Sequence, residues 1–527
     1  MINKLGLYIR TLRHLRMIQV FNRISRKFRK VKMRKITVEG TIPHTDWIHC
    51  AYSGSLSGDI FTFLNRSLPI RLPEDWNSCT TDKLWLYNLH YFDFLKQEDF
   101  IEGAEAEKWL DRWITENPPF KGNGWEPYPL SLRIVNWIKW VYSGNVLSAS
   151  QEASLALQAD ALEQQLEYHL LANHLMANGK ALIFAGTFFN GKSAKRWLQK
   201  GWQIYEREIK EEILSDGGHF ERSVMYHSII LEDLLDIWQL TKKEILCEPI
   251  KNMLVFLQGM LHPDRQIALF NDAAFGIAPT PDALFDYAEK LGFPVPGIIS
   301  GGVTDFPDSG YTHVSYRDWD LFIDTNGIAP SYQPGHSHAD TFSFELSYKG
   351  KRVITDSGTN CYQGSERLSQ RGTAAHNTVT VDDRNSSEVW SAHRVGARAN
   401  IIKRTLSETT IEASHNGFPG IVHTRRFEWG SDNITIQDIL TGAGIHQIKS
   451  YLHFAPDICV ELQKGNILTT NSGLCIQLPQ DCMITLDKTT EIGFEFGKKE
   501  KHTTICCCCT VPLPITLEIK IKCESCF

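Results

Sequence analysis

The sequence has 527 residues, of which 42% are hydrophobic and 22% charged, and its formal net charge is −6. This length exceeds one ordinary hydrophobic core, so we expect two or three domains, and the composition excludes a disordered or fibrous protein. Residues 1–38 contain twelve Lys or Arg and no Asp or Glu, which leaves 43 basic and 61 acidic residues in the remainder. A polyanion is therefore not drawn to the body of the protein by bulk charge and needs a locally positive cleft.

The basic N-terminal segment, residues 1–40, has no long apolar core and no small-residue cleavage site, so it does not read as a signal peptide. We therefore expect a cytoplasmic protein, with the cell envelope or periplasm as the alternative. A helical apolar stripe with a basic opposite face runs through Leu12, Leu15, Ile18, Val20 and Phe21. We expect a helix that packs on the body of the protein. A membrane-surface or nucleic-acid contact is the alternative, and of these two we expect no nucleic-acid partner. No apolar run is long enough for a transmembrane span.

Residues 41–300 form the predicted helical domain. Apolar residues recur there at intervals of three and four, which is typical of amphipathic helices, over residues 83–96, 130–142, 151–177, 179–189, 194–214 and 228–243. A Gly- and Pro-rich loop is expected over residues 117–130. Successive helices of this length suit an all-α bundle, solenoid or toroid.

Residues 301–527 form the predicted β domain, because the apolar period falls to two after a Gly- and Pro-rich joint. Phe342, Phe344, Leu346 and Tyr348 are expected to share one face of a strand, and Lys349-Gly350 predicts a tight turn. Many short alternating segments indicate an antiparallel β-sandwich. Thirteen cysteines include four in a row, residues 506–509, which alternate faces in a strand and cannot all pair locally, so we expect free thiols and the last strands of the sandwich here.

Three separated segments of the β domain supply a histidine, an aspartate and another histidine: His338, Asp356 and His376. Two imidazoles and one carboxylate are good ligands for a first-row metal, and zinc is the default. The alternative is that each histidine satisfies a hydrogen bond inside the sandwich.

Two segments of the helical domain concentrate polar groups. Asn173 and His174 are expected at the end of a helix, and a second group precedes a helix start: His219, Glu221, Arg222, Tyr226 and His227. Either set could be a hydrogen-bonded helix connection. Together with the HSH motif, His336-Ser337-His338, they suit elimination across a uronic acid. This reaction requires a neutralised carboxylate, a base for the C5 proton and an acid for the departing O4.

Several segments resemble the heparinase II/III family of polysaccharide lyases: "NHLMANGKALIFAGTFF", "DGGHFERSVMYHSIILEDLLDI", "GHSHADTFSFELSYKGKRVITDSGT" and "TAAHNTVTVDD". "LWLYNLHYFDF" and "GWEPYPLSLRIVNWIKW" are similar to N-terminal segments of its members. The likeness runs from about residue 80 to about residue 400 and is most specific in the HSH motif. It implies an incomplete (α/α) toroid followed by an antiparallel β-sandwich.

The resemblance also implies roles for individual residues. Asn173 and His174 match the positions that bind and neutralise the uronate carboxylate. Tyr226 matches the acid that also serves as base, and His336 matches the partner base. The implied metal site is a structural Zn²⁺ beneath the cleft, with His338, Asp356 and His376 as ligands.

Three further residues are candidates for substrate binding. Arg222 could hold a sulfate or carboxylate of the substrate, and a salt bridge to Glu221 or Asp233 is the alternative. Trp125 and Tyr128 lie in the long loop and could stack on sugar rings or simply pack in the core.

The main hypothesis is thus a lyase that acts by β-elimination on an anionic, uronate-containing polysaccharide. A glycoside hydrolase is a second possibility, for which the acids near the expected cleft are Asp216, Glu221 and Asp272. A non-catalytic carbohydrate-binding or assembly protein is a third. Heparan-like, alginate-like and capsular substrates all satisfy the same catalytic groups, and the sequence leaves the oligomeric state open.

Overall fold

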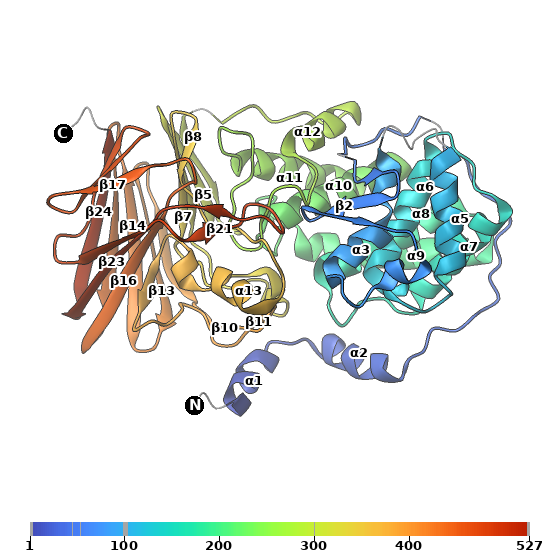
Figure 1. Cartoon of the computed structure of the whole chain (residues 1–527), viewed down its shortest axis with the longest axis horizontal. Helices are drawn as coiled ribbons and strands as arrows, with labels where there is room; N and C mark the ends of the chain where they lie inside the picture. The colour runs from blue at the N-terminus through green and yellow to red at the C-terminus, as the bar shows by residue number, and fades with distance from the viewer. Residues whose placement is uncertain (1–3, 45, 53, 98–103, 300, 524–527) are drawn as a thin grey trace.

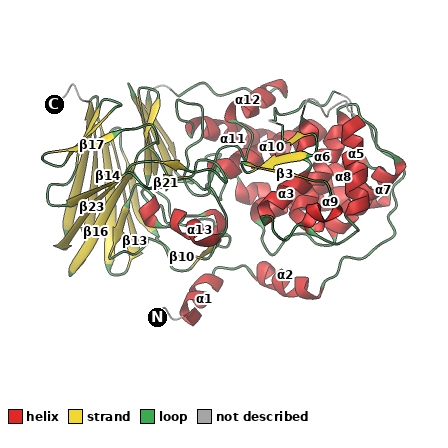
Figure 2. Ribbon diagram, in the orientation of Figure 1, coloured by secondary structure: helices red, strands yellow, loops and turns green. Residues whose placement is uncertain are grey.

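The computed structural model describes residues 4–44, 46–52, 54–97, 104–299 and 301–523. A helical half and a β half lie next to each other along the longest axis of the molecule (Figure 1), with most helices in one and most strands in the other (Figure 2). The change from helix to strand falls between Lys290 and Gly302. This confirms the predicted fold class of an incomplete (α/α) toroid followed by an antiparallel β-sandwich, and the exact domain limits remain a prediction.

The helical half is built from nine described helices that follow a small three-stranded sheet. The strands are β1 (Leu56–Ser57), β2 (Ile60–Phe63) and β3 (Arg66–Pro69). The helices are α3 (Lys83–Tyr91), α5 (Ala104–Glu116), α6 (Pro127–Tyr142), α7 (Ala149–Glu163), α8 (Ala172–Phe188), α9 (Lys192–Glu212), α10 (Val224–Thr241), α11 (Cys247–Gly259) and α12 (Pro281–Lys290). Several begin at side-chain caps, as where Asp82 accepts from the backbone N–H groups of Leu84 and Trp85.

The prediction of one helix over residues 151–177 was wrong. The chain leaves the helix after Glu163 and begins α8 at Ala172. Leu171 and Ala172 adopt positive φ values of 67° and 54°, which no continuous right-handed helix allows. Asn173 and His174 therefore stand in the first turn of a helix, where sequence periodicity had placed them at the end of one.

Two sheet layers form the sandwich. The strands of the first layer are β4 (Gly302–Phe306), β5 (Tyr311–Tyr316), β6 (Trp319–Asp324), β7 (Phe344–Tyr348), β8 (Lys351–Ile354), β9 (Val379–Val381), β16 (Ile445–His453), β20 (Met483–Asp487) and β23 (Thr504–Pro512). They make a five-stranded sheet, β4 to β8, and a four-stranded sheet in the order β20-β23-β16-β9. An isolated bridge from Ile354 to Phe454 connects these two sheets.

The second layer is an eight-stranded antiparallel sheet in the order β12-β13-β14-β15-β24-β19-β18-β17. Its strands are β12 (Ile401–Leu406), β13 (Thr410–Phe418), β14 (Ile421–Trp429), β15 (Asn433–Thr441), β17 (Val460–Gln463), β18 (Ile467–Thr470), β19 (Leu474–Gln477) and β24 (Ile515–Cys523). Two short hairpins complete the half, made of β10 (Val389–Trp390) with β11 (Arg394–Val395) and β21 (Glu491–Ile492) with β22 (Glu500–Lys501).

Local predictions for the sandwich are confirmed. Tyr348 pairs with Lys351 across a two-residue turn in which Lys349 and Gly350 both have positive φ, the conformation that matches strand twist. The four consecutive cysteines lie in β23, where Cys507 and Cys509 are buried and the other two half-buried. The described cysteines other than Cys475 are free thiols, and Cys526 lies outside the described residues.

The N-terminal segment forms two helices, α1 (Lys4–Leu12) and α2 (Met17–Phe28), along one side of the molecule (Figure 1). The predicted apolar stripe is split between them, and its members Leu12, Ile18 and Phe21 are exposed. The two helices contact the body through polar side chains such as Gln19 and Arg26, and beyond them Val31, Ile36 and Val38 pack against the core of the helical half. Among the described residues, no helix combines the length and apolarity that crossing a membrane requires.

Candidate active site

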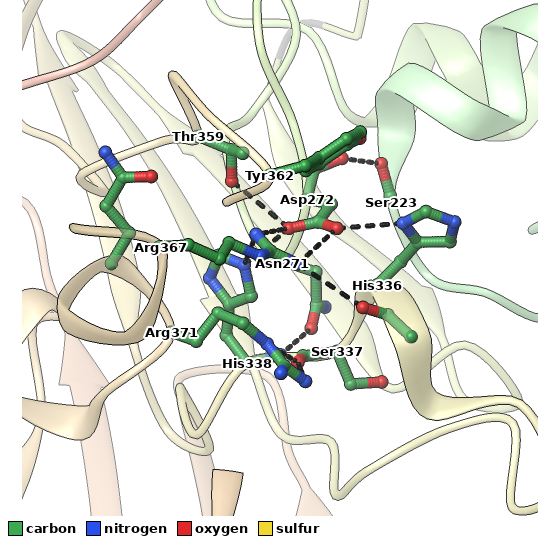
Figure 3. Close-up of polar contacts among 12 residues, drawn as sticks. Ser223, Asn271, Asp272, His336, Ser337, His338, Thr359, Tyr362, Arg367 and Arg371 are labelled. Atoms are coloured by element: carbon green, nitrogen blue, oxygen red, sulfur yellow. Dashed lines mark hydrogen bonds and ion pairs between the residues drawn. The ribbon is translucent and has the colours of Figure 1, made fainter. Parts of the chain in front are cut away.

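Polar side chains from both halves meet where the loops of the sandwich abut the helical half. Asn173 comes from the first turn of α8, and Tyr226 from the first turn of α10. Asp272 follows α11, and His336 ends a short 3₁₀ turn, Pro334–His336, between β6 and β7. Figure 3 shows this junction around Asp272 and His336.

Asp272 holds both histidines of the HSH motif. Its Oδ2 accepts from Nδ1 of His336 at 2.8 Å, and its Oδ1 accepts from Nε2 of His338 at 2.7 Å (Figure 3). Arg367 donates to the same carboxylate through both terminal nitrogens. Burial alone would raise the pKa of Asp272, but the Arg367 charge and the histidine hydrogen bonds hold this pKa well below its usual range. An ionised carboxylate only accepts, so His336 carries its proton on Nδ1 and, when neutral, exposes a lone pair on Nε2.

The loop that carries His336 is fixed by two buried arginines of one helix, α13 (Gly364–Gln370) and its C-cap. Arg367 binds Asp272, and Arg371 donates to the carbonyl oxygen of Ser337 at 3.1 and 2.7 Å. Both guanidinium side chains are fully buried. The imidazole of His336 therefore has a defined position and a defined tautomer.

Tyr226 lies directly over His336. Their ring centroids are 3.9 Å apart with an interplanar angle of 35°. The tyrosine hydroxyl is 2.9 Å from the hydroxyl of Tyr362. Burial, supported by the neighbouring Tyr362 and Asp272, raises the pKa of Tyr226 well above its usual value, so this phenol is a proton donor at neutral pH.

Ser223 connects the segment of Tyr226 to the segment of Asp272. As N-cap of α10 it accepts from the backbone N–H of Tyr226 at 3.3 Å, and its hydroxyl donates to the carbonyl oxygen of Asp272 at 2.5 Å. The turn that presents Tyr226 is thus tied to the segment that orients His336.

Asn173 and His174 are each engaged by a glutamate. Asn173 Nδ2 lies 3.1 and 2.9 Å from the two oxygens of Glu221 and 3.5 Å from Nε2 of His336. His174 Nδ1 lies 3.3 Å from Glu167 Oε1. Burial lowers the pKa of His174, but the charge and hydrogen bond of Glu167 outweigh this and raise it overall. A cationic His174 with a partly exposed ring suits a site for an anion.

Backbone strain gathers beside these residues. Positive φ values occur at Leu171 and Ala172 before Asn173, at Arg222 before the Ser223 cap, and at Asn271 before Asp272. Each such residue costs about 1–3 kcal/mol relative to relaxed backbone. Strain of this kind persists where the fold has to place particular side chains, and here it occurs at three of the segments that form the site.

The three predicted substrate-binding residues differ in their positions relative to the site. Tyr128 is half-buried, and its ring centroid lies 4.6 Å from that of His174, so it borders the site. Trp125 is buried against Trp113 and Phe120 and donates to the carbonyl oxygen of Asn117, which is a packing role.

Arg222 forms neither of the salt bridges that were its alternative. It donates to the carbonyl oxygens of Gly327 and Asp308 at 3.4 and 3.1 Å, and its Nε has no partner within the described part of the chain. The two acids foreseen for hydrolysis beside Asp272 are also engaged, Glu221 by Asn173 and Asp216 by the Ser309 backbone N–H and hydroxyl.

The predicted metal ligands are buried in the sandwich. His376 Nδ1 lies 2.8 Å from Asp356 Oδ2, and the rings of His338 and His376 are 5.3 Å apart. Each of the three residues keeps one buried atom without a hydrogen-bond partner: His338 Nδ1, Asp356 Oδ1 and His376 Nε2. These unpartnered donors fit a zinc ligand set chemically. As the described side chains stand, however, no group of three His, Cys, Asp or Glu is arranged to hold a metal ion.

Sequence reasoning missed several residues of the junction. Tyr362, Arg367 and Arg371 follow the β8 strand in an irregular segment that carries no recognisable signal, and Asp272 was considered only as a hydrolytic acid. His393 is exposed, and its ring lies 6.3 Å from that of His336 and 5.5 Å from that of Tyr362.

Two family models match most of the chain. Residues 104–280 match the heparinase II/III N-terminus, and residues 299–517 match the heparinase II/III-like C-terminal domain. The chain belongs to the heparinase II/III-like family. Its own Asn173, Tyr226, His336 and Asp272 lie within these matched ranges.

Similar proteins include curated heparin-sulfate lyases. The chain is 27% identical over 258 residues to one from Bacteroides stercoris, which is 43% of this chain and 38% of the relative. It is 23% identical over 426 residues to one from Bacteroides thetaiotaomicron, which is 68% of this chain and 58% of the relative. The chain therefore spans less than two thirds of the length of these relatives. A crystal structure of heparinase III superposes with a TM-score of 0.61 at 17% identity over 83% of this chain and 76% of the other, a likeness in fold.

Proposed function

We propose that this member of the heparinase II/III-like family is a polysaccharide lyase that cleaves a uronate-containing, anionic polysaccharide by β-elimination. The observation that carries the proposal is the pairing of His336 with Tyr226. His336 is held in the tautomer whose Nε2, in the neutral ring, can accept a proton, and Tyr226 is held as a protonated phenol with its ring centroid 3.9 Å from that of His336. A ring nitrogen that can take a proton, next to a phenol that holds one, is what elimination requires.

In the proposed reaction, the uronate carboxylate binds near Asn173 and His174. The amide and the imidazolium neutralise its charge, which acidifies the proton on C5. His336 Nε2 takes that proton, the C–H electrons form the C4–C5 double bond, and the C4–O4 bond breaks. Tyr226 gives its hydroxyl proton to O4, and the proton on His336 then returns to the phenolate, directly or through water.

To bind the uronate carboxylate, Asn173 must give up its hydrogen bonds to Glu221. Its amide now donates to Glu221, and burial, the largest influence, raises the pKa of that carboxyl. A bound uronate would compete for the same amide protons. We infer that Glu221 holds Asn173 in place while the site is free of substrate.

A structural zinc ion is part of the proposal, with His338, Asp356 and His376 as the residues that would hold it. Their unpartnered buried atoms support this assignment. When bound, the ion would fix the segments that carry His338 and Asp272 and would supply no group to the reaction.

The experiment is to incubate the protein with heparan sulfate, alginate and other uronate polysaccharides and follow the ultraviolet absorbance of the unsaturated product. We expect a rise for at least one polymer, and we expect Tyr226→Phe to reduce the rate by about a hundredfold or more. Tyr316→Phe, which changes a tyrosine on the exposed end of β5, is the matched control and should leave the rate unchanged. New reducing ends without the absorbance would instead establish hydrolysis.

A further inference from the structure

The two N-terminal helices present their apolar side chains to solvent. In α1 the exposed fractions are 68% for Leu5, 58% for Ile9 and 51% for Leu12. In α2 they are 79% for Met17, 67% for Phe21, 57% for Ile24 and 81% for Phe28. The spacing of these residues by three and four places each set on one side of its helix. These seven residues are called the apolar face below.

The opposite side of α2 is polar and lies on the body. Gln19 is fully buried, and its amide donates to the carbonyl oxygens of Leu170 and Tyr332 at 3.3 and 3.2 Å. Arg26, about two turns further along the same side, contacts the ring nitrogen of His169. Leu170 belongs to the helical half and Tyr332 to the sandwich, so α2 is anchored at the junction of both.

Helix α1 is held in the same manner. Arg10 forms an ion pair with Glu388, and Thr11 accepts from the indole N–H of Trp390 at 3.0 Å. An amphipathic helix of a globular protein normally turns its apolar side to the core. Both helices here do the reverse, because the side chains of the apolar face are exposed to solvent.

The same segment is strongly cationic. Of its twelve Lys and Arg, Arg10, Arg16 and Arg34 form ion pairs with described carboxylates. Lys27, Lys30 and Lys32 are exposed and have no carboxylate within ion-pair distance in the described part of the chain. These charges follow or flank the apolar side chains of α2.

We propose that the apolar face of α1 and α2 docks on an anionic lipid bilayer. A bilayer surface offers the two things this segment lacks: an apolar layer for Phe21, Ile24 and Phe28, and phosphate groups for the lysines beside them. An acidic polysaccharide satisfies the charges but buries little apolar surface. A second copy of the chain buries the apolar face but opposes one cationic segment to another.

The proposal is independent of the lyase reaction. The polar anchors join the segment to both halves, so docking would hold the whole protein at the membrane with its junction site attached.

The test is co-sedimentation of the full chain with vesicles of phosphatidylcholine alone or mixed with phosphatidylglycerol. We expect binding to the mixed vesicles that weakens as salt is added, because the lysine contribution is screened. Replacing Phe21 and Phe28 by Ser should reduce vesicle affinity by about tenfold or more. Lys27→Glu with Lys30→Glu should abolish the preference for anionic lipid.

The matched control is Ile298→Ser with Ile445→Ser, two apolar residues that are 76% and 71% exposed elsewhere on the surface. All these side chains are exposed, so the variants should fold like the unmodified protein, which their circular dichroism will show. Absence of vesicle binding would overturn the proposal. So would equal loss in the control, or self-association that the Phe21 and Phe28 changes abolish, which would assign the face to a second copy.

Discussion

The Nδ1 atom of His336 lies 2.8 Å from Oδ2 of Asp272, across the junction of the helical and β halves. Asp272 belongs to the loop after α11, whereas His336 belongs to the sandwich. The relationship means that the tautomer of the proposed base is set by the other half of the molecule.

Asp272→Asn should lower kcat by about a hundredfold to ten-thousandfold with little change in KM. An amide no longer fixes the Nδ1–H tautomer of His336 and gives no charge to stabilise the imidazolium that forms after proton transfer. Steady-state kinetics measures the split between kcat and KM, and ¹⁵N NMR of the histidine rings reports the tautomer directly.

Thr359→Val is the control for Asp272→Asn. Thr359 donates to Oδ1 of Asp272 at 3.3 Å, so its replacement disturbs the same carboxylate without changing its charge. We expect a change in kcat of less than about tenfold. An Asp272→Asn protein that folds normally and keeps its kcat would contradict the role given to Asp272.

Glu167→Gln should shift the alkaline limb of the pH–rate profile to lower pH. Glu167 raises the pKa of His174, so the cationic imidazole persists to higher pH and is lost as pH rises through that raised pKa. Removing the carboxylate charge lowers this pKa and makes the cation disappear earlier. The measurement is kcat/KM against pH.

Glu126→Gln controls for a general change of charge near this end of the helical half. Glu126 pairs with Lys83 and accepts from Tyr87, away from His174. Its profile should coincide with that of the unmodified protein. If Glu167→Gln also leaves the alkaline limb in place, His174 is not the group that neutralises the substrate.

His376→Ala should remove bound zinc. We expect about one zinc ion per purified chain, measured by mass spectrometry of the metal content, and a large loss in the variant together with a lower melting temperature. Chelator should lower the melting temperature of the unmodified protein and have little effect on His376→Ala.

His415→Gln tests whether such losses merely report damage to the sandwich. His415 is also buried and contacts the ring of His423, but it is outside the proposed ligand set. The variant should be less stable yet keep its zinc. A metal-free unmodified protein, purified without chelator, would refute the zinc assignment.

Gly186→Ala should destabilise the fold by about 1–3 kcal/mol. A Cβ at Gly186 in α8 would clash with the backbone nitrogen of Leu198 and lie 2.7 Å from the carbonyl oxygen of Ala194, both in α9. Gly297→Ala is the control, because nothing lies within 4 Å of its Cβ position. Urea unfolding measures both, and equal stability of the two variants would show that α8 and α9 can separate at little cost.

Much of the fold was predictable because it rests on local pattern. Helical spacing over residues 194–214 gave α9 (Lys192–Glu212), and the Lys349-Gly350 turn gave the β7–β8 hairpin. The break between α7 and α8 was not predictable, since positive φ at Leu171 and Ala172 is imposed by packing and not by residue type.

For the N-terminal helices too, the sequence pattern was not enough to predict the structure, because it does not say which side of each helix faces the body. Their amphipathic pattern was legible in the sequence, but pattern alone favoured apolar packing on the body. Only the positions of Gln19 and Arg26 on the body decided that the apolar face points outward.

The sequence by itself determined which residues are the candidates for chemistry: Asn173, Tyr226 and the two histidines of the HSH motif are visible from residue type and resemblance. Only the tertiary structure decided the orientation, tautomer and pKa of these side chains. A carboxylate, Asp272, and two arginines, Arg367 and Arg371, converge on the HSH loop from elements distant in the chain. Hydrogen-bond direction and burial, which set tautomers and pKa values, depend on such long-range neighbours, and no local pattern encodes them.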